Sequence, residues 1–188
     1  MKRTSLIVCI FVSSMLALAQ SPTSATKSDA PQAPAKDPVA TSLRGMVTRS
    51  QGDTIAALDA MPADKYSYKP TPDQITFGHL AAHIAEANYF LCSKVADVPA
   101  PMVEKAKDTD TKDQLLAAVK ASYAFCGDAL SKMDDSKLGD SVELFGGRKF
   151  LRAAAALHLA GGWADHYAAA AMYLRLNGVL PPSAKPKK

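Results

Sequence analysis

The segment FGHLAAHIAEANY, residues Phe77–Tyr89, carries the clearest structural pattern in the chain. Apolar positions in this segment and just beyond it recur every three or four residues, as in a helix with one buried side; they are Leu80, Ile84, Ala87 and Leu91. At about 100° per residue, His83 lies roughly 70° from the centre of this apolar stripe and His79 roughly 110° from it, on the same side. The segment therefore predicts a helix with two histidines, one turn apart, beside its buried face.

Other parts of the chain have the same helical spacing, and residues that stop helices separate them. We expect helices over about Val39–Met61, Asp73–Ala96, Thr111–Met133 and Lys149–Leu176. Thr71 or Asp73 would cap the second helix, and Ser141–Phe145 would form a short extended piece or a loop. Helices of this number and length predict an all-α fold, a four-helix bundle.

The connection between the second and third helices bears on the topology of the bundle. It has about fourteen residues, more than the two to eight that usually join antiparallel neighbours. A connection of this length can carry the chain back along the bundle, which would make the two helices parallel. Cys92 and Cys126 would then lie at similar heights, whereas antiparallel helices would separate them by roughly 16 Å. Two alternatives stay open for these residues: a disulfide, which an oxidising compartment favours, and two buried free thiols.

The chain begins with the parts of an export signal. Lys2 and Arg3 precede an apolar run from Leu6 to Leu18, and Ala17-Leu18-Ala19 has the A-x-A pattern that signal peptidase cleaves. The run has about 13 residues, fewer than the roughly 20 of a membrane-spanning helix. We therefore interpret residues 1–19 as a signal peptide, and we expect a periplasmic or secreted protein without a permanent membrane anchor.

The rest of the chain divides into one foldable unit and two polar ends. Residues 20–37 contain no large apolar side chain and predict a disordered linker. Residues 38–182 are the predicted bundle, and residues 183–188 are a basic tail. Lys2 and Arg3 are the only charged residues of 1–19, so losing that segment lowers the formal net charge from +4 to +2. A nearly neutral domain does not offer the basic face that nucleic acids require, and we expect no nucleic-acid partner.

The four histidines all fall on the second and fourth predicted helices. His79 and His83 are four residues apart, a spacing that lets two imidazoles bind one metal ion. On the fourth helix, His158 lies some 12 Å along the axis from His166 and about 80° around it. We therefore expect His158 and His166 not to share an ion. A single histidine on a helix is more often a surface or hydrogen-bonded residue than a ligand.

Three stretches of the chain resemble the DinB-like (DinB/YfiT-like) superfamily of helical metalloenzymes. They are Met61–Pro72, Phe77–Tyr89, and Asp165–Tyr167 with its continuation Tyr173–Gly178 and Pro181-Pro182. The resemblance implies a four-helix bundle of non-standard topology, in agreement with the long second connection. It also implies a divalent metal ion, often Ni²⁺ or Zn²⁺, bound between helices.

The ligands usual in that family are one histidine of the second helix and an H-x-x-x-H pair of the last helix. His83 matches the first of these ligands, and His166 matches the final histidine of the pair. Gly162 stands four residues before His166, where the resemblance implies another histidine. His79 is the local substitute, which would restore a site of three nitrogen ligands.

Two acidic residues lie near these histidines in the sequence. Asp165 points about 100° away from His166 around the helix. Its better role is therefore to hydrogen-bond a ligand histidine and orient it, not to bind the ion itself. Glu86, about one turn past His83, is the candidate general base.

Two functions follow from these residues. The first is an exported DinB-like protein that binds Zn²⁺ or Ni²⁺ and hydrolyses a small molecule, with metal ligands His83, His166 and His79. The second is a non-catalytic helical module for binding or stress response, in which the metal site has degenerated. Gly162 favours the second function and His79 favours the first. A homodimer through helix faces is the assembly that we expect of such a bundle.

Overall fold

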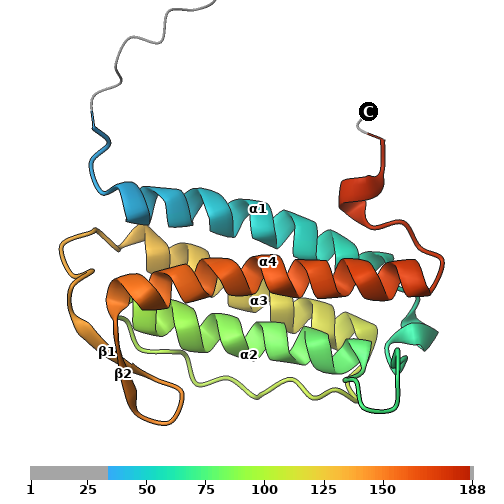
Figure 1. Cartoon of the computed structure of the whole chain (residues 1–188). Helices are drawn as coiled ribbons and strands as arrows, with labels where there is room; N and C mark the ends of the chain where they lie inside the picture. The colour runs from blue at the N-terminus through green and yellow to red at the C-terminus, as the bar shows by residue number, and fades with distance from the viewer. Residues whose placement is uncertain (1–33, 187–188) are drawn as a thin grey trace, which may run out of the picture. The chain divides into compact units, whose positions relative to one another are not determined.

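The computed structural model describes residues 34–186, which contain four helices and a short β-hairpin (Figure 1). The helices are α1 (Pro38–Ala60), α2 (Phe77–Ala96), α3 (Lys112–Ser131) and α4 (Arg152–Leu176), with two 3-10 helices, η1 (Ala63–Lys65) and η2 (Pro182–Ala184), and strands β1 (Ser141–Leu144) and β2 (Arg148–Leu151). The predicted four-helix bundle is confirmed. The predicted signal peptide lies outside the described residues, as does most of the predicted linker. None of the helices within residues 34–186 is both long and apolar enough to cross a membrane.

The helices form a ring in which α2 and α3 are parallel neighbours. Contacts join α1 to α3, α3 to α2, α2 to α4, and α4 to α1. In Figure 1, α1 and α4 run in one direction and α2 and α3 run in the other. Residues 97–111, which we call the strap, carry the chain back along the bundle between the end of α2 and the start of α3. The long connection is thus explained by the parallel arrangement.

A disulfide joins the two parallel helices. Cys92 of α2 and Cys126 of α3 are bonded, with their Cα atoms 5.2 Å apart, and both residues are fully buried. The disulfide is therefore the correct one of the two alternatives, because parallel helices bring these residues to the same height.

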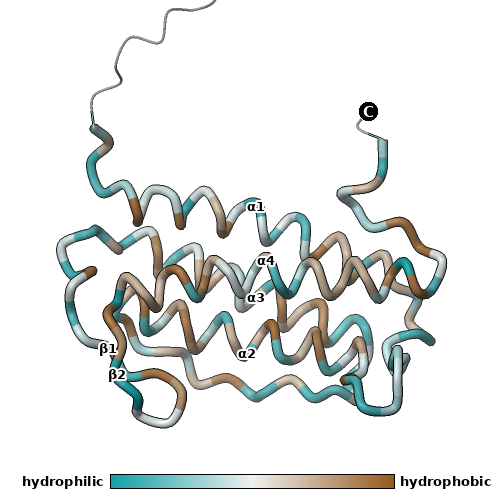
Figure 2. The backbone as a smooth tube through the Cα atoms, viewed as in Figure 1, coloured by the Kyte–Doolittle hydropathy of each residue, from teal (hydrophilic) through white to brown (hydrophobic). Residues whose placement is uncertain are grey.

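The core of the bundle combines apolar contacts with one buried polar network. Figure 2 shows the apolar positions of α1 on the side that faces the other helices, and Leu43 and Leu58 are among its buried residues. On α2, the buried Asn88 amide donates to Ser122 Oγ of α3 at 3.0 Å and accepts from Trp163 Nε1 of α4 at 2.9 Å. One side chain thus fixes the positions of three helices.

At the starts of two helices, polar side chains accept hydrogen bonds from the first backbone amides, which have no partner within the helix. Thr111 and Gln114 form a capping box at α3. At α1, the amides of Val39 and Ala40 donate to the carboxylate of Asp135, at 2.9 and 2.8 Å, from the segment that follows α3. The start of α1 therefore depends on a residue far along the chain.

The start of α2 differs from the prediction. The helix begins at Phe77 and is capped by Thr76, whose hydroxyl accepts from the His79 amide at 2.9 Å. Neither Thr71 nor Asp73 is the cap, because a turn with a bond from the Gln74 amide to the Thr71 carbonyl precedes the helix.

The start of α4 was also predicted too early. Lys149, the expected first residue, lies in β2, which pairs with β1 and places Glu143 opposite it. Gly146 and Gly147 take positive φ angles of 79° and 83° in the turn, which lets the chain fold back as a hairpin. Within the stretch expected to be a short extended piece or a loop, Ser141–Leu144 form strand β1 and Phe145 lies in the turn, so the hairpin comes before α4.

Gly78 lets the first turn of α2 pack against two other segments. Its amide donates to the Tyr66 carbonyl at 2.7 Å. A Cβ atom at this position would lie 2.6 Å from the Asp108 carbonyl oxygen of the strap and 3.3 Å from that of Tyr66. Both neighbours are backbone atoms, so only glycine fits here without a shift of the chain.

Replacing Gly78 by alanine should therefore destabilise the fold. Overpacking of this kind typically costs about 1–3 kcal/mol. Gly45→Ala in α1 is the matched control, because within residues 34–186 no neighbouring atom lies within 4 Å of its new methyl group. Alanine at that helical position should stabilise the protein by up to about 1 kcal/mol. Urea unfolding measures both free energies, and equal midpoints for the two variants would contradict the close approach at Gly78.

Loss of the disulfide should lower the free energy of unfolding by about 3–4 kcal/mol, as expected for a closed loop of this length. The bridged residues are 34 positions apart. The variant to measure is the double substitution Cys92→Ala and Cys126→Ala, compared with the native chain with and without dithiothreitol. Dithiothreitol should lower the unfolding midpoint of the native chain and leave that of the double variant unchanged. A native chain that loses its bridge without losing stability would contradict the prediction.

Candidate metal centre

Two of the predicted ligands meet between α2 and α4. The ring centres of His83 and His166 lie 5.1 Å apart, and the ring planes are at 88°. Both side chains line a pocket of about 280 Å³, whose other lining residues are Glu86, Ala87, Phe90, Leu91, Phe145, His158 and Gly162. Antiparallel packing of α2 and α4 brings the two histidines together across a distance of 83 residues in the sequence.

The separation of these rings is suited to a shared ion. Two imidazoles on one tetrahedral ion, with metal–nitrogen bonds of about 2.0–2.1 Å, have ring centres roughly 5 Å apart. In addition, Nδ1 of His166 is buried and has no hydrogen-bond partner among the described residues. A buried polar atom without a partner costs about 1–3 kcal/mol. An ion or a ligand group in the pocket would remove that cost.

The environment of His166 keeps its ring neutral. Burial and the neighbouring imidazole of His83 lower its pKa from 6.5 to about 4, while the Asp165 carboxylate acts in the opposite direction. The ring is therefore uncharged at neutral pH. A neutral imidazole is the form that donates a lone pair to a metal ion.

The third predicted ligand, His79, is not brought to this pocket. Its Nδ1 lies 4.0 Å from the carboxylate of Asp108 in the strap, and its ring is half exposed. Among residues 34–186, no three His, Cys, Asp or Glu side chains are grouped closely enough to hold a metal ion. The chain described here thus offers two nitrogen donors to an ion, and further donors would come from water or a ligand.

Gly162 leaves space where the family pattern implies a ligand. A Cβ atom there would meet only Cε1 of His166, at the ordinary contact distance of 3.9 Å, among the described neighbours. The glycine lines the same pocket as the histidine pair. A side chain at this position would therefore point toward free space beside His166.

The two acidic candidates, Glu86 and Asp165, lie near the pocket, but neither forms a hydrogen bond to His83 or His166 among the described residues. The Glu86 carboxylate lines the pocket and forms an ion pair with Lys105 of the strap. Asp165 is exposed and influences His166 through its charge. Because Nδ1 of His166 has no partner within residues 34–186, Asp165 does not fix it by a hydrogen bond.

His158 and two phenylalanines were not predicted as pocket residues. His158 lines the same pocket as His166, and its ring centre lies 5.1 Å from that of Phe145. Phe145 belongs to the hairpin turn and also contacts Phe90 of α2, with ring centres 5.9 Å apart. Spacing along α4 predicts that its two histidines do not share an ion, and this stays a prediction; the hairpin turn nevertheless completes one pocket that both histidines line. The Phe145-Gly146-Gly147 turn was the only sequence signal for this closure.

Comparisons with known proteins agree with this architecture. A family model described as the DinB superfamily matches residues 46–170. A crystal structure of a DinB-like protein from Bacillus subtilis superposes with a TM-score of 0.60 at 18% identity, covering 73% of this chain and 92% of that one. A DinB-like protein from Bacillus cereus ATCC 10987 gives a TM-score of 0.63 at 17% identity, covering 77% and 97%.

At such low identity the two crystal structures support the fold alone. No curated protein matches the sequence. The family model, however, spans well over half of the chain, including α2, α3 and the histidine pair. The chain belongs to the DinB superfamily.

Proposed function

We propose that this is an exported helical protein that binds a divalent metal ion, Zn²⁺ or Ni²⁺, between α2 and α4. His83 and His166 supply two nitrogen ligands, and water or a small molecule completes the coordination. The observation that carries the proposal is the paired rings, 5.1 Å apart, with a buried nitrogen that lacks a partner among the described residues.

The geometry favours a binding role over catalysis. Catalytic zinc sites usually have three protein ligands and one open position, whereas two donors meet here. The candidate base, Glu86, is engaged by Lys105. A metal ion held by two histidines has several open positions, so it is suited to capturing a ligand that supplies donors of its own. We therefore propose a non-catalytic binding module.

Hydrolysis is the alternative function. The pocket has room beside the histidine pair, at Gly162, and it is lined by His158 and Glu86. A metal-bound water in that space would be a nucleophile near neutral pH. Metal-dependent cleavage of p-nitrophenyl acetate that is lost in both His83→Ala and His166→Ala would support this function over the binding module.

Metal titration tests the proposed site. After removal of metals with EDTA, calorimetry of the untagged protein should detect one Zn²⁺ or Ni²⁺ ion per chain. His83→Ala and His166→Ala should each weaken binding at least about tenfold, or about 1.4 kcal/mol. His79→Ala is the matched control on the same helix and should bind normally. Equal losses in all three variants, or no binding by the native chain, would refute the proposed pair.

A variant that adds a third ligand provides a second test of the proposed metal site. Gly162→His adds an imidazole beside His166, where there is space for it, and should tighten Zn²⁺ binding because a third nitrogen joins the ion. Gly162→Ala controls for the change in helix propensity and should leave the affinity unchanged.

Export is supported by two independent features. The N-terminal sequence has the pattern of a cleaved signal, and the buried Cys92–Cys126 disulfide suits an oxidising compartment. Protein recovered from the periplasm or the medium should begin at Gln20 and show no free thiol, because Cys9 is removed with the signal. N-terminal sequencing and thiol titration measure these properties. An uncleaved cytoplasmic chain with reduced cysteines would contradict export.

A further inference from the structure

The outward side of α4 is apolar along most of the helix. A helix at the surface of a bundle normally carries charged residues on the side away from the core. Among the exposed residues of α4, only Asp165 and Arg175 are Asp, Glu, Lys or Arg. We use the name outer stripe for four exposed positions that lie within roughly 60° of one another around the helix: Leu157, Gly161, Ala168 and Met172. Leu157 is 74% exposed and Met172 is 57% exposed.

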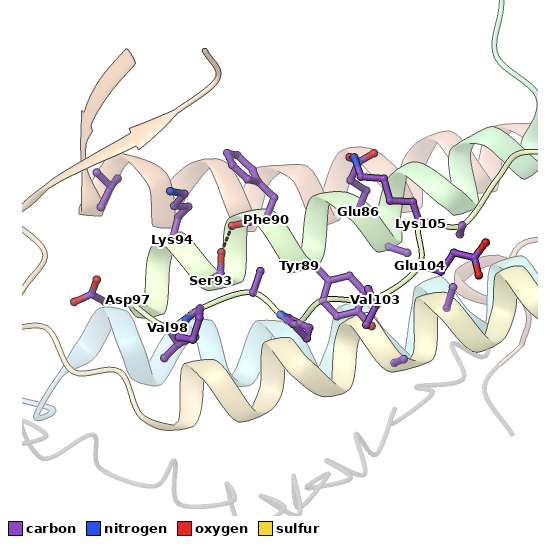
Figure 3. A pocket seen from close by; sticks show the side chains of 18 of the residues that line it. Glu86, Tyr89, Phe90, Ser93, Lys94, Asp97, Val98, Val103, Glu104 and Lys105 are labelled. Atoms are coloured by element: carbon purple, nitrogen blue, oxygen red, sulfur yellow. Dashed lines mark hydrogen bonds and ion pairs between the residues drawn. The ribbon is translucent and has the colours of Figure 1, made fainter. Parts of the chain in front are cut away.

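The side of the bundle formed by α2 and α3 is different. In Figure 3 the strap runs along these two helices, and the labelled side chains there include Glu86, Lys94, Glu104 and Lys105. That side is thus covered by a segment of the chain and carries charge. The outer stripe, by contrast, stays open to solvent within residues 34–186. An exposed apolar patch of this kind marks a surface where another molecule packs.

The outer stripe is arranged symmetrically about the middle of α4. Gly161 and Ala168, which are small, lie equally far along the chain from the peptide bond between residues 164 and 165. Leu157 and Met172, which are large, also lie equally far from it. In a two-fold interface, residue i of one copy contacts residue j of the other, and j contacts i. Two antiparallel copies of this stripe therefore match large side chains with large ones and small with small.

The small residues in the middle of the stripe allow two helices to approach closely. The distance between packed helix axes is about 8–10 Å and depends on the side chains at the contact. Even a Cβ atom added at Gly161 would meet no other atom within 4 Å in the described chain. The centre of the stripe is therefore free for a second helix, and Leu157 and Met172 offer apolar surface on either side of it.

The neighbouring helix α1 widens this face. A groove of about 530 Å³ lies between the two helices, and Met46 of α1 and Ala164 of α4 are among its lining residues. Met46 is 41% exposed. From Ala154 to Leu176, the outward side of α4 is about 33 Å long, so two helices of about 10 Å width offer roughly 660 Å². Specific interfaces begin at about 600 Å² per partner. The face is therefore large enough for a stable dimer.

The charges around the face are balanced. Asp165 and Arg175 of α4, and Arg49 and Asp53 beside the groove on α1, form no ion pair within residues 34–186. Two acidic and two basic residues give the face no net charge, so a second copy of the same face meets it without overall repulsion. A membrane surface or a nucleic acid would require an excess of basic residues. The balance favours a second copy of this chain as the occupant.

We propose that the chain forms a two-fold dimer in which the outer stripes of two α4 helices pack antiparallel. Leu157 of each copy contacts Met172 of the other, and Gly161 of each copy contacts Ala168 of the other. Asp165 lies about 50° from the centre of the stripe and beside its midpoint. Two Asp165 carboxylates therefore approach each other near the two-fold axis, at the solvated edge of the interface.

Sedimentation velocity of the full chain in EDTA tests the proposal, because a chelator prevents a shared metal ion from joining two copies. The native chain should sediment as a dimer at micromolar concentration. Leu157→Glu and Met172→Glu should each weaken the dimer at least tenfold, because a buried carboxylate without a partner opposes the packing. Ala124→Glu, at an exposed position of α3, is the matched control and should dimerise normally. All three positions are exposed, so circular dichroism should show that each variant is folded.

Two further measurements test the axis and the register. Asp165→Asn should strengthen the dimer, and by less at high salt, because salt screens the repulsion between the two carboxylates. Under mild oxidation, a mixture of the Gly161→Cys and Ala168→Cys variants should cross-link more than either variant alone, since these positions face each other only across the two copies. The cysteines of the described chain are already bonded to each other and do not interfere.

A native chain that sediments as a monomer would overturn the dimer. Leu157→Glu and Met172→Glu chains that dimerise as tightly as the Ala124→Glu control would overturn its location on α4. Equal cross-linking by the mixture and by the separate variants, or a weaker dimer in Asp165→Asn, would overturn the antiparallel register.

Discussion

The parallel packing of α2 against α3 is the constraint on which the rest of this molecule depends. It is held by the Cys92–Cys126 bond and by the hydrogen bond from Asn88 to Ser122. Two parallel neighbours need a connection that returns along the whole bundle, so the strap exists because of this packing. The same arrangement sets α2 against α4 on its other side, which is what brings His83 to His166. The histidine pocket therefore follows from this topology.

The histidine pocket contains two of the three histidines that the resemblance implies. His83 and His166 meet at a distance suited to one ion, yet the position of the expected third ligand is Gly162. The glycine turns a ligand position into free volume beside the pair. If the proposed ion binds to this pair, a ligand that brings its own donor atom would fit better than a substrate that needs a fully formed hydrolytic centre, because two histidines leave coordination positions open.

Much of this arrangement could be predicted from sequence, and the failures have physical causes. Helical spacing predicted the bundle, and the resemblance predicted that His83 and His166 would meet. The same spacing could not show that His79 faces Asp108, because the partner comes from the strap. Likewise, the start of α4 and the place of His158 depend on a hairpin that a helical pattern overlooks, since Lys149–Leu151 pair with β1 instead. Helical periodicity predicted the helices, and the errors arose where the strap, the hairpin or a turn before the helix decided the outcome.

The cap on α1 has a consequence for the order in which this chain folds. Its first amides rely on the carboxylate of Asp135, some 96 positions away, and the hydroxyl of Tyr173 near the end of α4 bonds to the Ile75 carbonyl just before α2. Contacts between such distant positions form slowly, because a long loop must close first. The first amides of α1 thus gain this carboxylate partner only after the region following α3 has been synthesised, so the start of the N-terminal helix is completed late in folding.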